Sequence, residues 1–122
     1  MLRTMCKGKI HRATVTEARL DYTGSITIGK ELMLAADIRP HELVHINSMA
    51  NAVHWETYAI PGKRGEICLN GCPARLFQPG DQIIILSLAH YEESELATFA
   101  QKVVFVDVRN AIVPIETQLV PA

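Results

Sequence analysis

The sequence predicts a mainly β fold with a few short helices, from its strand-like segments, its composition and its length. The segments are short, rich in Val, Ile and Thr, and end at turn-forming residues. Of the 122 residues, 48% are hydrophobic and 20% are charged, which excludes disordered, collagen-like and coiled-coil chains. A chain of this length has room for one hydrophobic core, so residues 1–122 are expected to form a single domain, a small barrel or sandwich.

The expected strands are the segments in which branched residues cluster. Each is roughly four to eight residues long, the usual length of a strand. In chain order they are Lys9–Thr16, Ser25–Ile28, Leu43–Ile46, Glu66–Leu69, Ile83–Leu88 and Val103–Val108.

Two dipeptides mark turns between these strands. Pro79-Gly80 suits the central positions of a type II turn, because Pro presets φ at the first position and Gly accepts a positive φ at the second. Asn70-Gly71 predicts a tight turn after the strand Glu66–Leu69, and Pro73 prevents a regular ladder beyond it.

Two stretches are predicted to be helical. Glu31–Ala36 has its apolar residues on one face and an acidic residue in the first turn, where it complements the helix dipole. Glu92–Gln101 has an apolar stripe and several glutamates near its N-terminus.

Residues from about 111 to 122 are expected to form a tail.

Charge and hydropathy exclude several classes of function. Twelve Lys and Arg against thirteen Asp and Glu give a formal net charge of -1. The chain therefore lacks the excess of positive charge that is typical of nucleic-acid-binding and polybasic membrane proteins. The longest apolar run, Ile83–Ala89, is far shorter than the roughly twenty residues that cross a bilayer. Charged residues interrupt any signal-peptide hydrophobic region near the start. We therefore expect a cytoplasmic protein with a small-molecule or protein partner, and neither nucleic acid nor membrane.

The cysteines do not form a standard metal or redox motif. Cys6, Cys68 and Cys72 make an odd count, and three residues separate the last two, where a zinc knuckle has two. The sequence also lacks a Gly-rich nucleotide loop, a His-Glu-x-x-His pair and a Gly-x-Ser-x-Gly elbow. Free thiols and no metal are therefore expected.

Several polar residues in the β framework are candidates for a site, each with an ordinary structural alternative. Lys9 and His11 share a strand face, where they can meet a carboxylate or form a solvated surface. Gly24-Ser25 joins an open carbonyl to a hydroxyl, but such pairs are usually turns. Thr57-Tyr58 can face a pocket or pack as strand residues. These residues alone leave the function open.

Short motifs occur along the chain in an order that is more specific than any one of them. They are Lys9–Thr16, Tyr22-x-Gly24-Ser25, Thr57–Ile60, Lys63–Gly65, Asn70-Gly71 and Pro79–Asp81. This ordered set, at nearly the same spacing, resembles the pyruvoyl-dependent aspartate α-decarboxylase family and covers the chain from about Met1 to Asn110.

The resemblance implies a fold, an assembly and a self-processing reaction. The fold is a small double-psi β-barrel with short helices, and four copies form a homotetramer with active sites between neighbouring subunits. The chain cuts itself between Gly24 and Ser25 into residues 1–24 and 25–122. The Ser25 hydroxyl attacks the preceding carbonyl, and β-elimination and hydrolysis leave a covalent pyruvoyl group at residue 25. Some family members need a maturation partner for this step.

The implied reaction is decarboxylation of L-aspartate to β-alanine, the precursor of pantothenate, through a Schiff base between the pyruvoyl ketone and the substrate amine. Neither a metal nor pyridoxal phosphate is required. Ser25 and Tyr58 are the catalytic residues, with Tyr58 as the general acid, and Thr57 polarises the Gly24 carbonyl during processing. A strained backbone at Gly24 is expected to favour the acyl shift. The substrate-binding residues are Lys9, His11, His54, Thr57, Asn70, Gly71, Cys72 and Pro73.

Two departures from the family pattern bear on the substrate. His54 replaces the arginine that grips a substrate carboxylate and lacks its planar fork and permanent charge. Either a protonated His54 or Lys9 is the candidate cation. Cys72-Pro73 replaces two small residues, and Pro73 lacks a backbone N–H. Two alternatives therefore stay open: the same mechanism on a different amino acid, and an unprocessed barrel with a binding or regulatory role.

Overall fold

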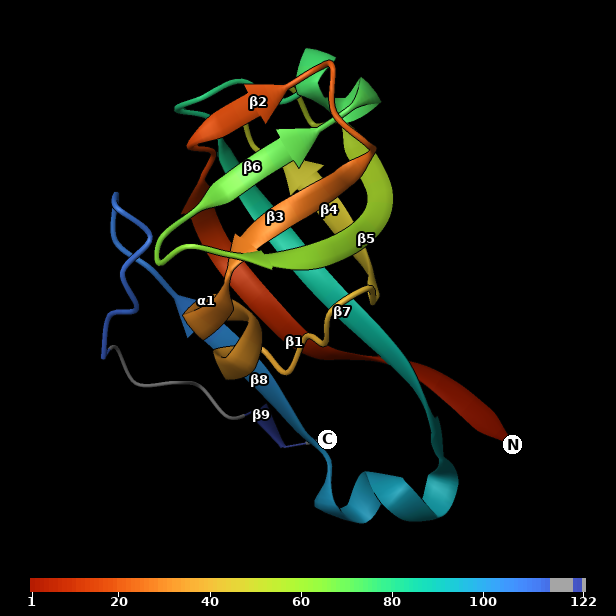
Figure 1. Cartoon of the computed structure of the whole chain (residues 1–122). Coiled ribbons are helices and arrows are strands. Elements are labelled where there is room, and N and C mark those ends of the chain that lie inside the picture. The colour runs from red at the N-terminus through yellow and green to blue at the C-terminus, as the bar shows by residue number, and fades with distance from the viewer. Residues whose placement is uncertain (115–119, 122) are drawn as a thin grey trace.

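A computed structural model describes residues 1–114 and 120–121 and consists mainly of strands (Figure 1). The elements, in chain order, are β1 (Leu2–Thr14), β2 (Glu17–Arg19), β3 (Ser25–Gly29), α1 (Lys30–Ala35), β4 (Leu43–Ser48), β5 (His54–Gly62), β6 (Ile67–Asn70), the 3-10 helix η1 (Cys72–Arg75), β7 (Gln82–Glu92), the 3-10 helix η2 (Glu93–Thr98), β8 (Ala100–Phe105) and β9 (Val120–Pro121). The predicted mainly β class with short helices is confirmed.

The strands form one sheet in the order β2-β6-β3-β5-β4-β7-β1-β8-β9. Most neighbours are antiparallel, but β1 with β8, β2 with β6 and β3 with β5 are parallel. This mixed pairing is consistent with a small β-barrel. It places β3 between β5 and β6, although both of these strands come much later in the sequence.

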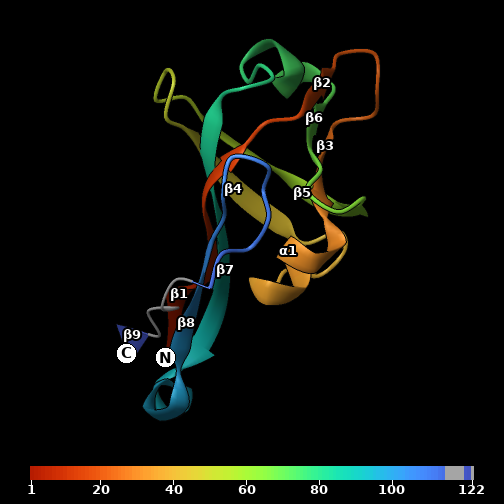
Figure 2. The ribbon, with the colours of Figure 1, turned by 90° about the vertical axis from the view of Figure 1, so that its left-hand side faces the viewer.

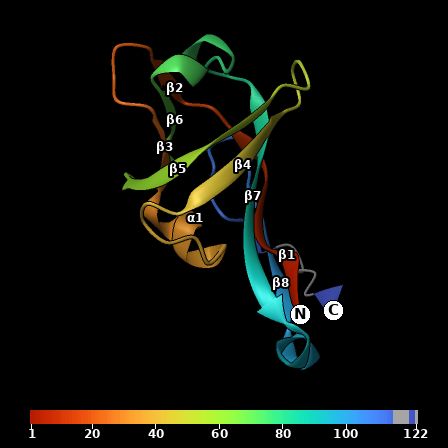
Figure 3. The ribbon, with the colours of Figure 1, turned by 90° about the vertical axis from the view of Figure 1, so that its right-hand side faces the viewer.

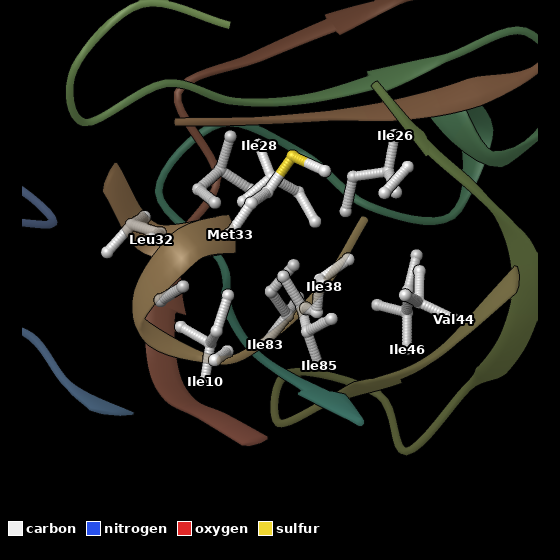
Figure 4. Close-up of a cluster of buried hydrophobic side chains, with 14 of the residues drawn as sticks. Ile10, Ile26, Ile28, Leu32, Met33, Ile38, Val44, Ile46, Ile83 and Ile85 are labelled. Carbon is white, nitrogen blue, oxygen red and sulfur yellow. The ribbon is translucent and has the colours of Figure 1, made fainter. Parts of the chain in front are cut away.

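The core is built from alternate residues of neighbouring strands. Ile10 of β1 pairs with Ile85 of β7, which pairs with Ile46 of β4, and all three side chains are fully buried. Strand β3 lies between β5 and β6 and is buried along almost its whole length. Figure 4 shows side chains from these strands and from α1 converging on one cluster. Burial of each such side chain contributes roughly 1.5–3 kcal/mol.

Part of the sheet extends away from this core. The first residues of β1 pair with the last residues of β7, from Leu2 opposite Glu92 onward, and η2 follows at the end of β7. Figures 2 and 3 show β1, β7 and β8 running together as an arm that ends at η2. This arm has no core of its own to cover it.

Helix α1 packs closely against β1. It confirms the helix predicted at Glu31–Ala36 to within one residue. Gly8 of β1 lies so close to the end of α1 that a Cβ built on it would overlap the carbonyl oxygen of Ala36. The helix ends there because Asp37 adopts a left-handed conformation with φ 58°, and the N–H of Ile38 donates to the carbonyl of Met33 at 2.8 Å.

The α-helix predicted at Glu92–Gln101 is wrong, both in the type of helix and in the residue at which it ends. The segment Glu93–Thr98 forms a 3-10 helix with no buried residue, and the chain is already in strand β8 from Ala100. A capping box between Glu92 and Glu95 starts the turn. An α-helix needs an apolar face to bury, and the end of the arm offers no surface for it.

The predicted strands exist, with differences in extent. Strands β1 and β7 are longer than expected because they continue into the arm, and β8, predicted at Val103–Val108, spans Ala100–Phe105. Strands β2, β5 and β9 were not predicted. The sequence of β5 alternates polar residues with Trp55, Thr57 and Ala59, so it lacks the run of branched residues that marks the other strands.

The predicted turns are confirmed. Gly80 has φ 94°, and the N–H of Asp81 donates to the carbonyl of Gln78 at 3.0 Å, as a type II turn at Pro79-Gly80 requires. Gly71 has φ 83° and redirects the chain from β6 into η1.

In the described chain, no helix has the length and apolarity needed to cross a membrane.

The tail expected from about residue 111 is corrected in its described part. Ile112 forms a β-bridge with Val106, and the N–H of Val113 donates to the carbonyl of Phe105 at 3.0 Å. Strand β9 pairs with β8. Residues 115–119 and 122 lie outside the described residues.

The contact between β1 and α1 predicts a stability effect. We expect Gly8→Ala to lower the free energy of unfolding by about 3 kcal/mol, because the new methyl group meets backbone that cannot rotate away. Leu34→Ala, on the exposed side of the same helix, should change it by less than about 0.5 kcal/mol. Urea unfolding measures both values. Equal stability of the two variants would contradict the close approach.

Candidate active site

A cleft of about 310 Å³ opens beside the Gly24-Ser25 bond. Three parts of the chain form its walls: the loop between β2 and β3, the middle of β5, and the turn from β6 into η1. Its lining residues are Leu20, Tyr22, Gly24, Trp55, Glu56, Thr57, Gly71, Cys72 and Pro73. Five of the residues predicted for processing or substrate binding therefore meet here: Gly24, Thr57, Gly71, Cys72 and Pro73.

Ser25 lies behind Gly24 and is held by Asn70. Its side chain is only 3% exposed, and the register of β3 and β6 sets it opposite Asn70. The Asn70 amide donates to the Ser25 Oγ at 3.0 Å, and Ser25 Oγ donates to the carbonyl of Thr23 at 3.3 Å. The same amide donates to Thr27 Oγ1 at 2.9 Å. Asn70 thus positions the serine and is itself buried.

Gly71 lies close to the backbone of Gly24 and Tyr22. A Cβ on Gly71 would come within 2.8 Å of the Gly24 Cα and 3.1 Å of the Tyr22 carbonyl oxygen. The Gly71 N–H donates to the carbonyl of Arg19 at 2.8 Å, which ties this turn to the end of β2. A glycine is needed here for its positive φ and for this close approach.

The backbone strain expected at Gly24 is not found. Among the described glycines, a positive φ occurs at Gly65, Gly71 and Gly80, and not at Gly24. A Cβ on Gly24 would meet only the Asn70 carbonyl oxygen, at 3.9 Å. The residue that requires a glycine-specific backbone conformation is therefore Gly71, which lies next to Gly24 in space.

Thr57 and Tyr58 point to opposite sides of β5, as successive strand residues do. Thr57 shares its side with Trp55, which packs against the core, and lines the cleft with Gly24. Among residues 1–114, no hydrogen bond joins Thr57 to the Gly24 carbonyl. Tyr58 lies on the outer side, with its ring centroid 6.1 Å from that of His41.

Lys9 also lies on the outer face of the sheet, away from the cleft. Lys9 pairs with Leu86, Leu86 with His45, and His45 with Glu56, so these side chains form one row across β1, β7, β4 and β5. Three steps between strands place Lys9 about 14 Å from Glu56. Within one chain, the structure does not bring Lys9, His54 or Tyr58 to the cleft.

The surroundings of His11 disfavour its charged form. Its ring meets Phe105 edge-on, with ring centroids 5.5 Å apart. Burial, and then the positive charges of Lys9 and Arg12, lower the pKa of the His11 imidazole. Lys9 is therefore the cation of this pair.

His54 is surrounded by polar groups that the sequence does not reveal. Its Nδ1 lies 2.7 Å from Asn47 Oδ1, and its Nε2 lies 3.3 Å from His45 Nδ1 and 3.4 Å from Glu56 Oε2. The residues come from β4 and β5, which pair antiparallel. The alternation of His54 and Glu56 was the one available signal, but it has meaning only once β5 is recognised as a strand.

Cys68 and Cys72 differ in their surroundings. Cys68 is buried in β6, and its thiol donates to Asn70 Oδ1 at 3.3 Å. Burial, and then the negative charge of Glu17, raise the pKa of the Cys68 thiol, so it stays protonated. Cys72 is exposed at the cleft. All three cysteines are free thiols, as expected.

Comparison with known proteins identifies the family. Residues 1–113 match the family described as aspartate decarboxylase. The chain is 53% identical over 120 residues to an aspartate 1-decarboxylase of Acetivibrio thermocellus, covering 97% of this chain and 95% of the relative. It is 57% identical over 114 residues to one of Clostridium botulinum, covering 92% of each chain.

A third relative, the aspartate 1-decarboxylase of Pelotomaculum thermopropionicum, is 55% identical over 117 residues, or 94% of this chain and 89% of the relative. These matches extend along almost the whole chain and include both the cleft and the outer face. The chain therefore belongs to the aspartate decarboxylase family.

Proposed function

We propose that this chain decarboxylates L-aspartate to β-alanine and CO₂ with a pyruvoyl group that it makes from Ser25. The observation that carries the proposal is the arrangement at residues 24 and 25. A buried serine hydroxyl is held by the Asn70 amide directly beside a glycine that opens onto a cleft. Family membership supplies the reaction for which this arrangement is suited.

Processing would begin at the Gly24-Ser25 bond. The Ser25 Oγ attacks the Gly24 carbonyl carbon, the C–N bond breaks, and the serine nitrogen takes the proton, which leaves an ester. Loss of the Ser25 α-proton expels residues 1–24 as a carboxylate. Water then replaces the nitrogen of the resulting enamine, and ammonia leaves. The products are residues 1–24 and a chain of residues 25–122 that begins with a pyruvoyl group.

The surrounding residues support this sequence of steps. The Asn70 amide donates to the Ser25 Oγ, and the Ser25 hydroxyl donates to the Thr23 carbonyl. Together these two hydrogen bonds hold the Ser25 hydroxyl in one orientation. Gly71 keeps the Gly24 backbone in place by direct contact. Thr57 lines the same cleft as Gly24 and is the candidate donor to the oxyanion that forms on its carbonyl.

After processing, the pyruvoyl group supplies an electrophilic ketone and an electron sink for loss of the substrate carboxylate. It would lie at the start of β3, next to Asn70 and the cleft. Tyr58 is the proposed general acid that protonates the substrate carbon, and Lys9 is the proposed cation for a carboxylate. Substrate contacts are assigned to Gly71, Cys72 and Pro73 of the cleft wall and to the buried Asn70 beside it.

The separation of these groups supports an assembly. Lys9 and Tyr58 lie on the outer face of the sheet, while Gly24 lines the cleft. A site that needs both groups is completed when the outer face of one copy covers the cleft of another. We therefore propose a homotetramer in which each active site lies between two subunits.

A second candidate is the same chemistry on a different amino acid. His54 stands where the family pattern has an arginine, and its Nε2 is already 3.4 Å from the Glu56 carboxylate. A histidine next to a carboxylate is a poor receptor for a second carboxylate. Assay of the processed enzyme with a panel of amino acids decides between the two substrates.

The proposed processing predicts a mass change. Purified wild-type protein should give two fragments, residues 1–24 and a pyruvoyl-terminated 25–122 that phenylhydrazine labels. Ser25→Ala removes the nucleophile and should give one intact chain without decarboxylase activity. Intact mass spectrometry measures both. Decarboxylation by Ser25→Ala would overturn the pyruvoyl mechanism.

Asn70 is predicted to set the rate of cleavage. Asn70→Ala removes the donor to the Ser25 Oγ and should slow processing about tenfold or more, because one lost hydrogen bond costs roughly 1–2 kcal/mol. Thr27→Val removes the other acceptor of the same amide and should process at nearly the normal rate. A cleavage time course by electrophoresis, on variants with matched thermal unfolding, tests this. Normal cleavage of Asn70→Ala would remove its positioning role.

The shared active site predicts complementation between inactive subunits. Ser25→Ala chains lack the pyruvoyl group but keep Tyr58, whereas Tyr58→Phe chains process but lack the acid. Mixed assemblies, isolated through two different tags, should recover about a quarter of wild-type activity, since that share of randomly formed interfaces is complete. Activity no higher than that of the parent variants would place both residues in one subunit.

A further inference from the structure

Three ligand atoms converge on the outer face of β4 and β5. His45 Nδ1 lies 3.3 Å from His54 Nε2, His54 Nε2 lies 3.4 Å from Glu56 Oε2, and His45 Nδ1 lies 3.9 Å from the same oxygen. The antiparallel register that pairs His45 with Glu56 and Asn47 with His54 fixes this arrangement. No rearrangement of the backbone is needed to bring the three atoms together.

Asn47 determines which nitrogen of His54 is available. Its Oδ1 accepts a hydrogen bond from His54 Nδ1 at 2.7 Å, so Nδ1 carries the proton and Nε2 has a free lone pair. Nε2 is the nitrogen that faces His45 and Glu56. A hydrogen bond from the second ring nitrogen to an amide or carboxylate oxygen is the usual support for a metal-binding histidine.

The cluster carries a negative charge, from Glu56, unless an imidazole is protonated or a cation binds. With both imidazoles neutral, the three converging atoms carry at most one proton, on His45 Nδ1, and the Glu56 oxygen faces the lone pair of His54 Nε2. Repulsion between these acceptors is relieved when a positive ion lies between them. The exposed fractions of His45, His54 and Glu56 are 22%, 48% and 49%, so an ion can enter from solvent.

We infer that His45, His54 and Glu56 bind a divalent transition-metal ion, with Zn²⁺ as the best match. An ion equidistant from the three ligand atoms lies about 2.1 Å from each of them, the normal length of zinc–imidazole and zinc–carboxylate bonds. Two imidazoles and one carboxylate select zinc, cobalt or nickel over magnesium and calcium, which prefer oxygen ligands. The sequence alone predicts no metal, because the ligands come from two strands whose pairing it does not reveal.

The ion would have an open coordination position. Three protein ligands leave zinc a fourth position for water or another ligand. The net charge of the cluster changes from -1, from Glu56, to +1 when a divalent ion binds. A carboxylate is the ligand that such a position favours, and Glu56 also lines the cleft beside Gly24. Resting on the proposed function, we assign the ion a role in binding the substrate carboxylate, where an arginine would otherwise supply the positive charge.

Metal binding is tested without any enzyme assay. Chelator-treated protein is titrated calorimetrically with ZnCl₂, and the absorption spectrum is recorded with CoCl₂. We expect one ion per chain, cobalt bands typical of four-coordinate nitrogen and oxygen ligands, and no heat with MgCl₂. His45→Ala and Glu56→Gln should each weaken zinc binding at least tenfold, the usual effect of removing a metal ligand.

His90→Ala is the matched control. This exposed histidine of β7 lines the same pocket as His45, but its Nδ1 lies 3.1 Å from Thr4 Oγ1 and it is not one of the three converging residues. It should leave zinc binding unchanged. Absence of binding at millimolar zinc, or binding that survives both His45→Ala and Glu56→Gln, would overturn the site.

The role of the ion in substrate binding has a separate readout. On fully processed enzyme, removal of the metal should raise KM for aspartate at least tenfold, with a smaller change in kcat, and zinc should restore it. An unchanged KM would overturn this role and leave the metal site intact. If the processed protein fails to decarboxylate aspartate at all, the proposed function fails, while the titration still decides the metal site.

Discussion

The hydrogen bond from Asn70 to Ser25 depends on the register of β3 and β6. A shift of one residue would turn Asn70 to the other face of the sheet and leave the serine hydroxyl without its donor. Two contacts hold the neighbouring turn: the Gly71 N–H bonds the end of β2, and Gly71 itself touches Gly24. The Gly24-Ser25 bond is thus positioned by strand pairing and by the neighbouring Gly71.

Strand β5 serves two sites because its residues alternate. Thr57 faces the cleft beside Gly24, and Tyr58 faces the outer surface that also carries His54 and Glu56. Thr57 lines this cleft, whereas Tyr58 does not. The proposed function therefore assigns both residues to one reaction only in an assembly, where the Tyr58 side of one copy covers the cleft of another.

Local signals predicted much of the fold. The segments at β3, β4, β6 and α1 and the turn at Pro79-Gly80 are specified by neighbouring residues, and they are found where expected. The structure at the end of the β7 arm is not specified by local residues. The segment η2 lies beyond the core, so no surface is present there to stabilise the α-helix that the sequence predicts. For the site, the resemblance predicted Ser25 and five of the residues that line the cleft, but not Leu20, Trp55 or Glu56. It did not identify Asn70 as the partner of Ser25, since that contact joins residues 45 positions apart.

Contacts between different strands cannot be read from the sequence, and for that reason the replacement of the family's arginine by His54 looks like a simple loss of a carboxylate-binding group. Compared with an arginine, a lone histidine loses charge and two-pronged geometry, so the substitution weakens carboxylate binding. The structure places His45 and Glu56 beside it and uses Asn47 to fix its tautomer. Four polar side chains on two strands then form one unit whose charge depends on what it binds. A substitution that lowers affinity when considered alone becomes a change in the kind of cation that this surface offers to a carboxylate.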